Sequence, residues 1–186
     1  MNTKVIAILV VAVLAVCAVT AVFLMKGDDD DDKDGTGKTT DFSLLSDDKI
    51  APGMTVEVTT SDMGMKQTVK HVVTSVEDNK VYCDQYVNGT KSSNPVNYPV
   101  DMFFFYTLKP IEETDFPEGT KTSTVQHMGV DMVLHEFNGT VTMGIQDFNL
   151  ENGKFYVYKG YVWDGTGKDT STKSSFSTVS YLYMKK

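Results

Sequence analysis

The sequence predicts a mainly β domain that follows an N-terminal transmembrane helix. One observation is an uncharged apolar run from Val5 to Met25. The other is that segments rich in Val, Thr, Tyr and Phe alternate with short Gly, Asn and Asp turns from Phe42 onward, while no stretch keeps a helical period. We therefore expect an antiparallel curved sheet, a half-barrel or a barrel, of about eight or nine strands.

The apolar run is long enough to span a bilayer, because at 1.5 Å rise per residue it gives a helix of about 30 Å. A cleaved signal peptide has a shorter apolar core of about 7 to 15 residues, so we expect the helix to be retained. The segment from Leu14 to Cys17 resembles a lipobox, but Val16 stands where a small residue is usual. Lipidation of Cys17 is therefore the alternative, and both interpretations place the chain at a membrane.

The composition is acidic and contains no arginine. The 186 residues carry 25 acidic side chains against 17 basic ones, all of them lysines, for a net charge of -8. Arginine is the usual residue for bidentate binding of phosphate and guanine, so we expect no nucleic acid partner. Lys4 and Lys26 flank the apolar run almost evenly, but two glycosylation sequons favour an extracytoplasmic domain. We expect a single-pass protein of the cell membrane, with the N-terminus in the cytoplasm and the domain outside.

An acidic linker joins the anchor to the domain. The expected organisation is a short segment 1–4, the anchor 5–25, the linker 26–41 and the β-rich domain 42–186. The run of aspartates and the glycines of the linker favour a solvated spacer. Calcium binding is the alternative, because acidic residues stand at ligand positions of an EF-hand-like loop, namely Asp30, Asp32, Asp34 and Asp41. No amphipathic helix flanks this loop, and we expect no other cofactor.

Nine segments of the domain have the composition and pattern of strands. They are residues 55–61, 66–76, 80–87, 102–108, 120–126, 130–137, 140–148, 154–163 and 176–184. Residues 102–108 are apolar on both faces, which predicts a central strand. Asn138-Gly139 predicts a hairpin turn of type I′, and Asn88-Gly89 and Asn152-Gly153 predict turns of the same kind. Asn88 and Asn138 also begin glycosylation sequons, so glycan attachment would be a second use of these turns.

A weak internal repeat relates residues 52–108 to residues 117–184. Five residues recur at one constant offset: Pro52, Thr55, Thr59, Met63 and Gly64 as Pro117, Thr120, Thr124, Met128 and Gly129. The repeat predicts two related antiparallel units that share one sheet or close a barrel. Chance matching among residues that are common in strands is the alternative.

No catalytic motif is present in the sequence. His71, His127 and His135 form no recognised pattern, and His135-Glu136 lacks the second histidine of a zinc-protease motif. Cys83 lies in a predicted strand and has no partner in the domain, so we expect it to be a small buried hydrophobic residue. We expect the histidines to be structural or surface residues and the protein not to be an enzyme.

Aromatic and methionine side chains are abundant, with nine Tyr, ten Phe, ten Met and one Trp. A curved sheet with more of these side chains than its core needs would form a groove for an apolar ligand. The candidate ligand-binding residues are Phe103, Phe105, Met132, Met143, Tyr156, Tyr158 and Trp163. Ordinary packing of the same residues in a core is the alternative.

The organisation of the chain resembles that of archaeal surface proteins with one membrane span. The shared features are an Ala- and Val-rich anchor flanked by lysines, a linker of Asp and Gly, and a strand that starts at Gly119-Thr120-Lys121. The resemblance implies an archaeal origin and an extracytoplasmic β-rich domain, and it assigns no activity or site. The predicted meander is also similar to the half-barrel of lipoprotein carriers.

Two functions fit these observations. The first is a membrane-anchored extracytoplasmic binding module for an apolar ligand or partner. The second is a structural or adhesive cell-surface protein without a small-molecule ligand. A contiguous apolar lining inside the sheet would favour the first function, and a filled core with exposed Thr, Ser and Tyr faces would favour the second.

Overall fold

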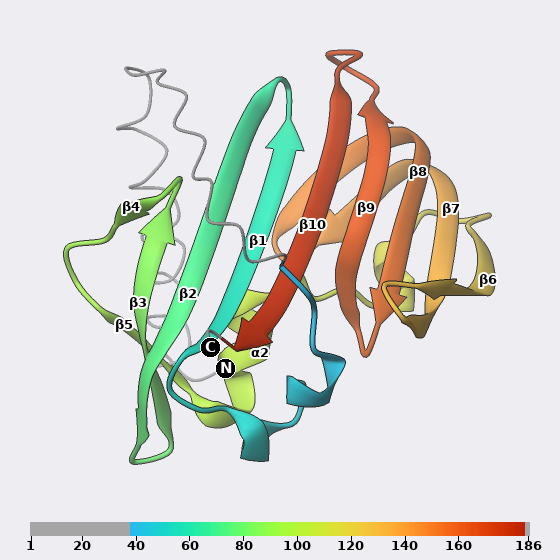
Figure 1. The fold of residues 1–186 in the computed structure, drawn as a ribbon. Helices are drawn as coiled ribbons and strands as arrows, with labels where there is room; N and C mark the ends of the chain where they lie inside the picture. The colour runs from blue at the N-terminus through green and yellow to red at the C-terminus, as the bar shows by residue number, and fades with distance from the viewer. Residues whose placement is uncertain (1–37, 185–186) are drawn as a thin grey trace, which may run out of the picture. The chain divides into compact units, whose positions relative to one another are not determined.

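Ten antiparallel strands form the sheet in the computed structural model, which describes residues 38–184 (Figure 1). The strands follow the order β4-β3-β2-β1-β10-β9-β8-β7-β6 across the sheet, and β5 also pairs with β3. The prediction of a mainly β, antiparallel domain is therefore confirmed. A closed barrel is wrong, because β4 and β6 stand at opposite ends of this order and no pairing joins them within the described residues.

The bounds of the elements are as follows. The strands are β1 Met54–Asp62, β2 Met65–Glu77, β3 Lys80–Val87, β4 Thr90–Lys91, β5 Val96–Pro99, β6 Lys121–His127, β7 Val130–Met143, β8 Gln146–Tyr158, β9 Tyr161–Asp169 and β10 Ser175–Met184. The short helices are η1 Phe42–Leu44, η2 Asp47–Lys49, η3 Val100–Met102, α2 Phe103–Thr107 and η4 Glu113–Asp115.

The middle of the sheet is the pair β1 and β10, which runs from Met54 opposite Met184 to Ser61 opposite Ser177. In β1, Met54 and Val56 have no exposed surface, as expected for alternate residues on the core side of a strand. Glu57 points to the other side, where it forms an ion pair with Lys38. The segment before β1 thus contributes a charge that balances a carboxylate of the central strand.

Five hairpins within residues 38–184 are closed by two successive residues with positive φ, including Asp78-Asn79 between β2 and β3 and Lys159-Gly160 between β8 and β9. The φ angles are 51° and 75° at Met63-Gly64, which joins β1 to β2, and 51° and 83° at Met128-Gly129, which joins β6 to β7. They are 48° and 80° at Asn88-Gly89, between β3 and β4. Two successive positive φ angles define a type I′ turn, so the hairpin predicted at Asn88-Gly89 is confirmed.

The other two Asn-Gly pairs do not form turns, and the hairpins predicted there are wrong. Asn138-Gly139 lies inside β7 and Asn152-Gly153 inside β8, and the register of the sheet shifts at both places. These irregularities are β-bulges, which also need unusual φ angles; φ is 126° at Gly139 and 53° at Asn152. The chain instead turns at Gly144-Ile145 and at Lys159-Gly160, so the predicted strands 140–148 and 154–163 are each divided.

Residues 102–108 form a helix, so the central strand predicted there is wrong. η3 and α2 follow each other without a break. Phe103, Phe104 and Thr107 are buried in α2, while Phe105 is 49% exposed, which is the pattern of a helix with one buried face. A short apolar run fits a buried strand and a buried helix equally well by periodicity, which explains the error. α2 packs against β1 and β5.

Two clusters of buried side chains make up the core. The first joins β1, β2 and β3 to α2 and to Trp163 of β9. The second lies among β7, β8, β9 and β10 and consists of Ile111, Phe137, Val141, Met143, Phe148, Leu150, Phe155, Val162 and Phe176. Cys83 has no exposed surface and belongs to the first cluster, as predicted.

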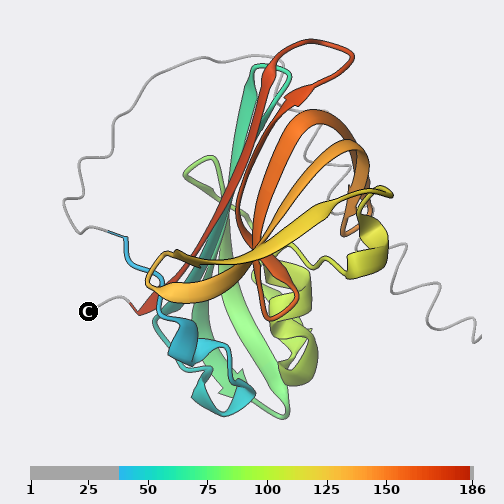
Figure 2. The same cartoon turned by 90° about the vertical axis from the view of Figure 1, so that its right-hand side faces the viewer.

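β7 and β8 arch over the second cluster (Figure 2). The hairpin end of the arch reaches the segment that follows α2, where Gly144 N donates a hydrogen bond to Pro110 O at 3.2 Å. Both bulges lie within the arch, and bulges bend and twist the strand that carries them. A further register shift lies at Tyr156 and Val157 of β8, so the arch contains several irregularities that favour its curvature.

The segment before β1 runs beside β10 and then passes below the ends of β10 and β1 in the view of Figure 1. Asp41 N donates to Leu182 O of β10 at 2.8 Å, and Phe42 and Leu44 are buried in the first cluster. No helix within residues 38–184 is long and apolar enough to cross a membrane. The predicted anchor 5–25 and the linker as far as residue 37 lie outside the described residues.

Candidate functional site

The predicted apolar site does not come together as one lining. Phe103, Met132 and Trp163 are at most 1% exposed in the first cluster, whereas Met143 lies in the second cluster. Phe105 is on the exposed side of α2. Tyr156 and Tyr158 are partly buried against the first cluster. These side chains are therefore used mainly to fill the core.

Phe42 fills the space beside the aromatic residues of β8 and β9. The centroid of its ring lies 4.8 Å from that of Trp163 and 4.9 Å from that of Tyr158, and both contacts are edge to face. The Trp163 indole Nε1 donates to Tyr158 O at 3.1 Å, which satisfies the buried donor. Sequence reasoning missed Phe42, although the apolar residues that follow Asp41 were a signal that the chain folds onto the sheet there.

A pocket of about 350 Å³ opens where the segment before β6 meets the bulges of β7 and β8. The residues that line it are Glu118, Gly119, Lys121, Glu136, Phe137, Asn138, Asn152, Gly153 and Lys154. The lining is mainly polar. Of the predicted site residues it includes only the glycosylation candidate Asn138, and none of the apolar candidates.

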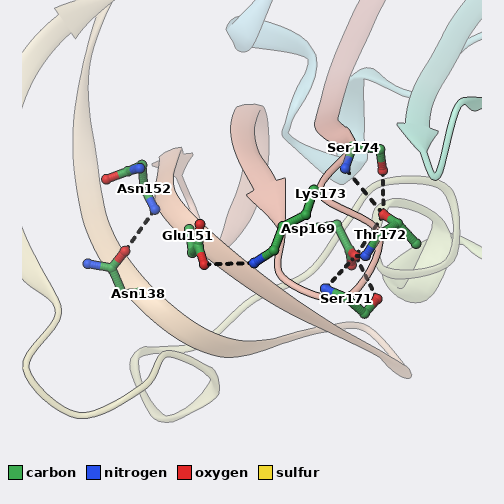
Figure 3. A network of polar contacts seen from close by, with 8 residues as sticks. All are labelled: Asn138, Glu151, Asn152, Asp169, Ser171, Thr172, Lys173 and Ser174. Carbon is green, nitrogen blue, oxygen red and sulfur yellow. Dashed lines mark hydrogen bonds and ion pairs between the residues drawn. The ribbon is translucent and has the colours of Figure 1, made fainter.

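The two bulges shape this pocket. Asn152 N donates to the side-chain Oδ1 of Asn138 at 2.8 Å, which joins the bulges of the two strands (Figure 3). A Cβ atom at Gly153 would lie 2.5 Å from the ring of Phe137, so the ring can pack against β8 only because residue 153 is glycine. Gly139 allows the segment before β6 to pack closely on β7, since a Cβ atom at residue 139 would lie 3.2 Å from Pro117. At Gly139 and Gly153 the backbone is therefore in close contact with the side chains of Pro117 and Phe137.

Charges of both signs meet in the pocket. Lys154 Nζ lies 2.9 Å from Glu136 Oε1, with both side chains about half exposed. The hydrogen bond to Glu136 raises the pKa of Lys154. Lys121 stands opposite Glu136 in the β6–β7 pair, and Glu118 adds a second carboxylate. Two lysines and two glutamates therefore leave the pocket with no net formal charge.

A loop rich in hydroxyl groups lies beside the bulge of β8. Lys173 of this β9–β10 loop forms an ion pair with Glu151 of β8 at 3.3 Å, one residue before Asn152 (Figure 3). Asp169 Oδ1 accepts hydrogen bonds from the backbone N and the hydroxyl of both Ser171 and Thr172, at 2.6 to 2.9 Å. These bonds lower the pKa of Asp169 to about 2. The carboxylate holds the loop in one conformation next to the pocket.

None of the three histidines is among the residues that line the pocket. His71 and His135 are 4% and 3% exposed, and the Phe116 ring stacks on His135 with centroids 4.1 Å apart. His127 Nε2 lies 2.9 Å from Asp164 Oδ2, and its ring stacks on Tyr156. His127, the last residue of β6, thus contacts β9, and β7 and β8 lie between these two strands in the sheet order. The contacts are those of packing and of a hydrogen bond between elements.

Within residues 38–184, no group of three or more His, Cys, Asp and Glu side chains is placed to hold a metal ion. Of the predicted calcium ligands only Asp41 is described, and Asp30, Asp32 and Asp34 lie outside the described residues. Asp41 Oδ1 accepts bonds from Ser43 Oγ at 2.6 Å and from Ser43 N at 2.9 Å, and these bonds lower the pKa of Asp41. Its carboxylate caps η1.

No protein family, curated protein or solved structure matches the chain.

Proposed function

We propose that this protein is a membrane-tethered, extracytoplasmic surface protein of the adhesive class, which contacts its target through the polar pocket at the bulges of β7 and β8. The observation that carries the proposal is how the side chains are distributed. The large apolar residues fill two cores, while an open polar pocket lies on the arch of the sheet. A filled core with a polar surface suits adhesion better than carriage of an apolar molecule.

The surface of the strands supports the same function. In the edge strand β6, Thr122, Ser123 and Thr124 are exposed, and on β10 Ser175 and Ser177 are exposed. Hydroxyl groups both donate and accept hydrogen bonds, so such a surface can contact a polar target directly or through water. The binding of an apolar ligand or partner, the other function expected from the sequence, has less support, because Phe103, Met132 and Trp163 are already packed.

The tether remains a proposal that depends on the apolar run 5–25. A helix of this length followed by an acidic spacer would hold the domain outside the cell membrane. The test uses sealed, right-side-out vesicles that contain the full chain. Added protease should release the domain, and the anchor should stay with the lipid after alkaline washing. Protection of the domain in intact vesicles would contradict the proposed orientation, and loss of the whole chain on washing would contradict the tether.

The curvature and a duplication are further parts of the proposal. The arch of β7 and β8 (Figure 2) supports the half-barrel expected from the sequence as the architecture of this half of the sheet. The β1–β2 and β6–β7 hairpins are closed by the same Met-Gly pair, and both methionines have a φ of 51°. These matched turns support an origin from two related meanders, of which the second acquired the bulges that form the pocket.

Adhesion can be measured with proteoliposomes that carry the full chain and a fluorescent lipid. We expect them to be retained on whole cells of the source organism, and to be retained much less when they carry the Glu136→Gln, Lys154→Gln double variant. Glu77→Gln is the matched control, because Glu77 is exposed at the end of β2 and is not part of the pocket. Retention no greater than that of protein-free liposomes would contradict the adhesive function.

The carriage function has its own test. The full chain is extracted with organic solvent after exchange into a defined detergent, and the extract is analysed by mass spectrometry. We expect no apolar molecule in stoichiometric amount. A one-to-one apolar molecule that the detergent exchange does not remove would favour carriage over adhesion.

A further inference from the structure

The pocket at the bulges combines hydrogen-bond donors and acceptors without a net charge. We propose that it binds a neutral saccharide; this inference rests on the proposed adhesive function and names the class of its ligand. Sugar hydroxyls both donate and accept hydrogen bonds, so they match a lining that offers amides, carboxylates and ammonium groups together. A pocket of about 350 Å³ is at the small end of the usual range for ligand sites, roughly 300–1,000 Å³.

The charges of the pocket decide against ionic ligands. Two lysines and two glutamates line it, and Lys154 is already paired with Glu136 at 2.9 Å. A phosphate or a carboxylate would meet the glutamates, and an ammonium group would meet the lysines, so either ligand would face a like charge. A neutral hydroxyl can instead donate to Glu136 while another accepts from Lys154, which leaves the ion pair in place.

The amide groups of the bulges are oriented before any ligand arrives. Asn138 Oδ1 accepts a hydrogen bond from Asn152 N, which fixes the plane of the Asn138 carboxamide. Its Nδ2 atom is the other end of the same planar group and remains available as a donor in the pocket. Asn152 has a φ of 53° and is the only non-glycine residue inside a strand of residues 38–184 with a positive φ. Strained backbone of this kind is typical of binding sites, where bulges re-aim side chains.

The floor of the pocket adds a small apolar element. Phe137 is 4% exposed and its ring packs under Gly153, so backbone without a side chain covers an aromatic ring at this point. A sugar ring has an apolar face of C–H groups between its polar edges. Such a face can lie on the Gly153 backbone while the hydroxyls at the ring edge reach the polar side chains around it.

The surroundings allow an oligosaccharide to extend beyond the pocket. The β9–β10 loop beside the β8 bulge exposes the hydroxyl-bearing residues Ser171 and Thr172, and Asp169 keeps the loop ordered (Figure 3). The loop is joined to β8 through the ion pair of Lys173 with Glu151. A second or third sugar unit would therefore meet a fixed polar surface rather than solvent.

The test uses the full chain, made in a bacterial host without N-glycosylation and held in lauryldimethylamine oxide, a detergent without a sugar headgroup. Glucose, galactose, mannose and N-acetylglucosamine, and disaccharides of each, are the probes. Saturation-transfer NMR detects their binding, and competition gives the dissociation constant. We expect at least one probe to bind and inorganic phosphate not to displace it.

Variants connect binding to the pocket. Glu136→Gln and Lys154→Gln should each weaken binding by about tenfold, because each replaces a charged hydrogen-bond partner by a neutral one. Both side chains are about half exposed, so the fold should survive, and the melting temperature of each variant verifies this. Glu77→Gln should bind like the unchanged chain.

Absence of binding by every probe would overturn the inference, and so would binding that neither pocket variant weakens. The adhesion assay separates this inference from the function on which it rests. Proteoliposomes that adhere to cells while no saccharide binds would refute the saccharide ligand and leave adhesion in place. Saccharide binding without adhesion would support the ligand class and refute the adhesive use of the pocket.

Discussion

His71 is a buried imidazole held by neutral groups. Its Nε2 atom lies 3.0 Å from the Tyr98 hydroxyl and 3.0 Å from the Gln85 amide nitrogen, both of which can donate. The ring then carries its proton on Nδ1, an atom that has no hydrogen-bond partner among the described residues. Burial lowers the pKa of His71 to about 4, because a charged imidazolium at this place would lose its hydration without gaining a counter-ion.

This environment makes stability depend on pH. The pKa of His71 rises to about 6.5 on unfolding, so its contribution is fully present above about pH 6.5 and falls by up to about 3 kcal/mol as pH approaches 4. Urea unfolding midpoints at pH 7.5 and 4.5 should therefore differ less in His71→Gln than in the unchanged chain. His135→Gln should have a smaller effect, because the charge of Glu113 opposes the effect of burial there. An unchanged pH response in His71→Gln would contradict the assignment.

Asp169 also makes stability fall as pH falls, but in a lower pH range and because the folded chain favours its charged form. Its pKa in the folded chain is about 2, below the ordinary value of 3.8, because four hydrogen bonds stabilise the carboxylate. The corresponding stability is present above about pH 4 and is lost as pH falls toward 2. Thermal unfolding should show a smaller decrease between pH 6 and pH 2.5 in Asp169→Asn than in the unchanged chain. Equal decreases would mean that the loop does not depend on this charge.

At the scale of the elements, β9 needs a glycine where it packs against the second cluster. A Cβ atom at Gly165 would lie 2.8 Å from the Phe155 ring and 3.0 Å from Thr178 Cγ2. Gly165→Ala should therefore destabilise the fold by about 1–3 kcal/mol through overpacking, measured as the shift of the urea midpoint. Thr166→Ala, at the exposed neighbouring position, is the control. If both variants unfold at the same midpoint, the packing of Phe155 across β9 is not as tight as described.

The elements also show which sequence signals are decisive. Segments rich in Val, Thr, Tyr and Phe between short turns predicted β1, β2, β3, β6 and β10 within one or two residues of their bounds. The three Asn-Gly pairs predicted turns, and only Asn88-Gly89 forms one, whereas Gly139 and Asn152 have positive φ within bulges. Whether an Asn-Gly pair closes a turn or lies in a bulge depends on how the flanking residues pair with the neighbouring strands. Residues 103–107 were misassigned because a run of aromatics has no period.

The two sequons belong to different elements and should behave differently. Asn88 is exposed in the β3–β4 turn, and its Oδ1 accepts a bond from Thr68 N at 2.8 Å, so its nitrogen is directed away from that bond. Asn138 lines the pocket. We expect peptide mass spectrometry of the chain from its own membrane to find a glycan on Asn88 and none on Asn138. An occupied Asn138 would contradict a free pocket, and loss of the glycan in Asn88→Gln identifies the first site.

At the scale of the whole molecule, the candidate site could not be read from the sequence. In the sequence, nothing distinguishes Lys121, Glu136 and Lys154 from other charged residues of strands. They come together because β6, β7 and β8 are neighbours in the sheet. The candidate residues for an apolar groove were chosen from composition. Composition correctly indicated many large apolar side chains, but it could not indicate that Phe42 and a second core beneath the arch would use them.

The strand order also predicts how the molecule opens. β1 and β10 are central and carry residues without exposed surface, such as Val56 and Leu182, whereas β6 is an edge strand whose first four residues are exposed. Hydrogen exchange of the full chain should therefore find the slowest amides in β1 and β10 and faster exchange in the hydrogen-bonded amides of β6. Partial opening at β6 would disturb Lys121 and the pocket without unfolding the centre. If β6 instead exchanges as slowly as β1, the sheet opens only as one unit, and the pocket is as rigid as the core.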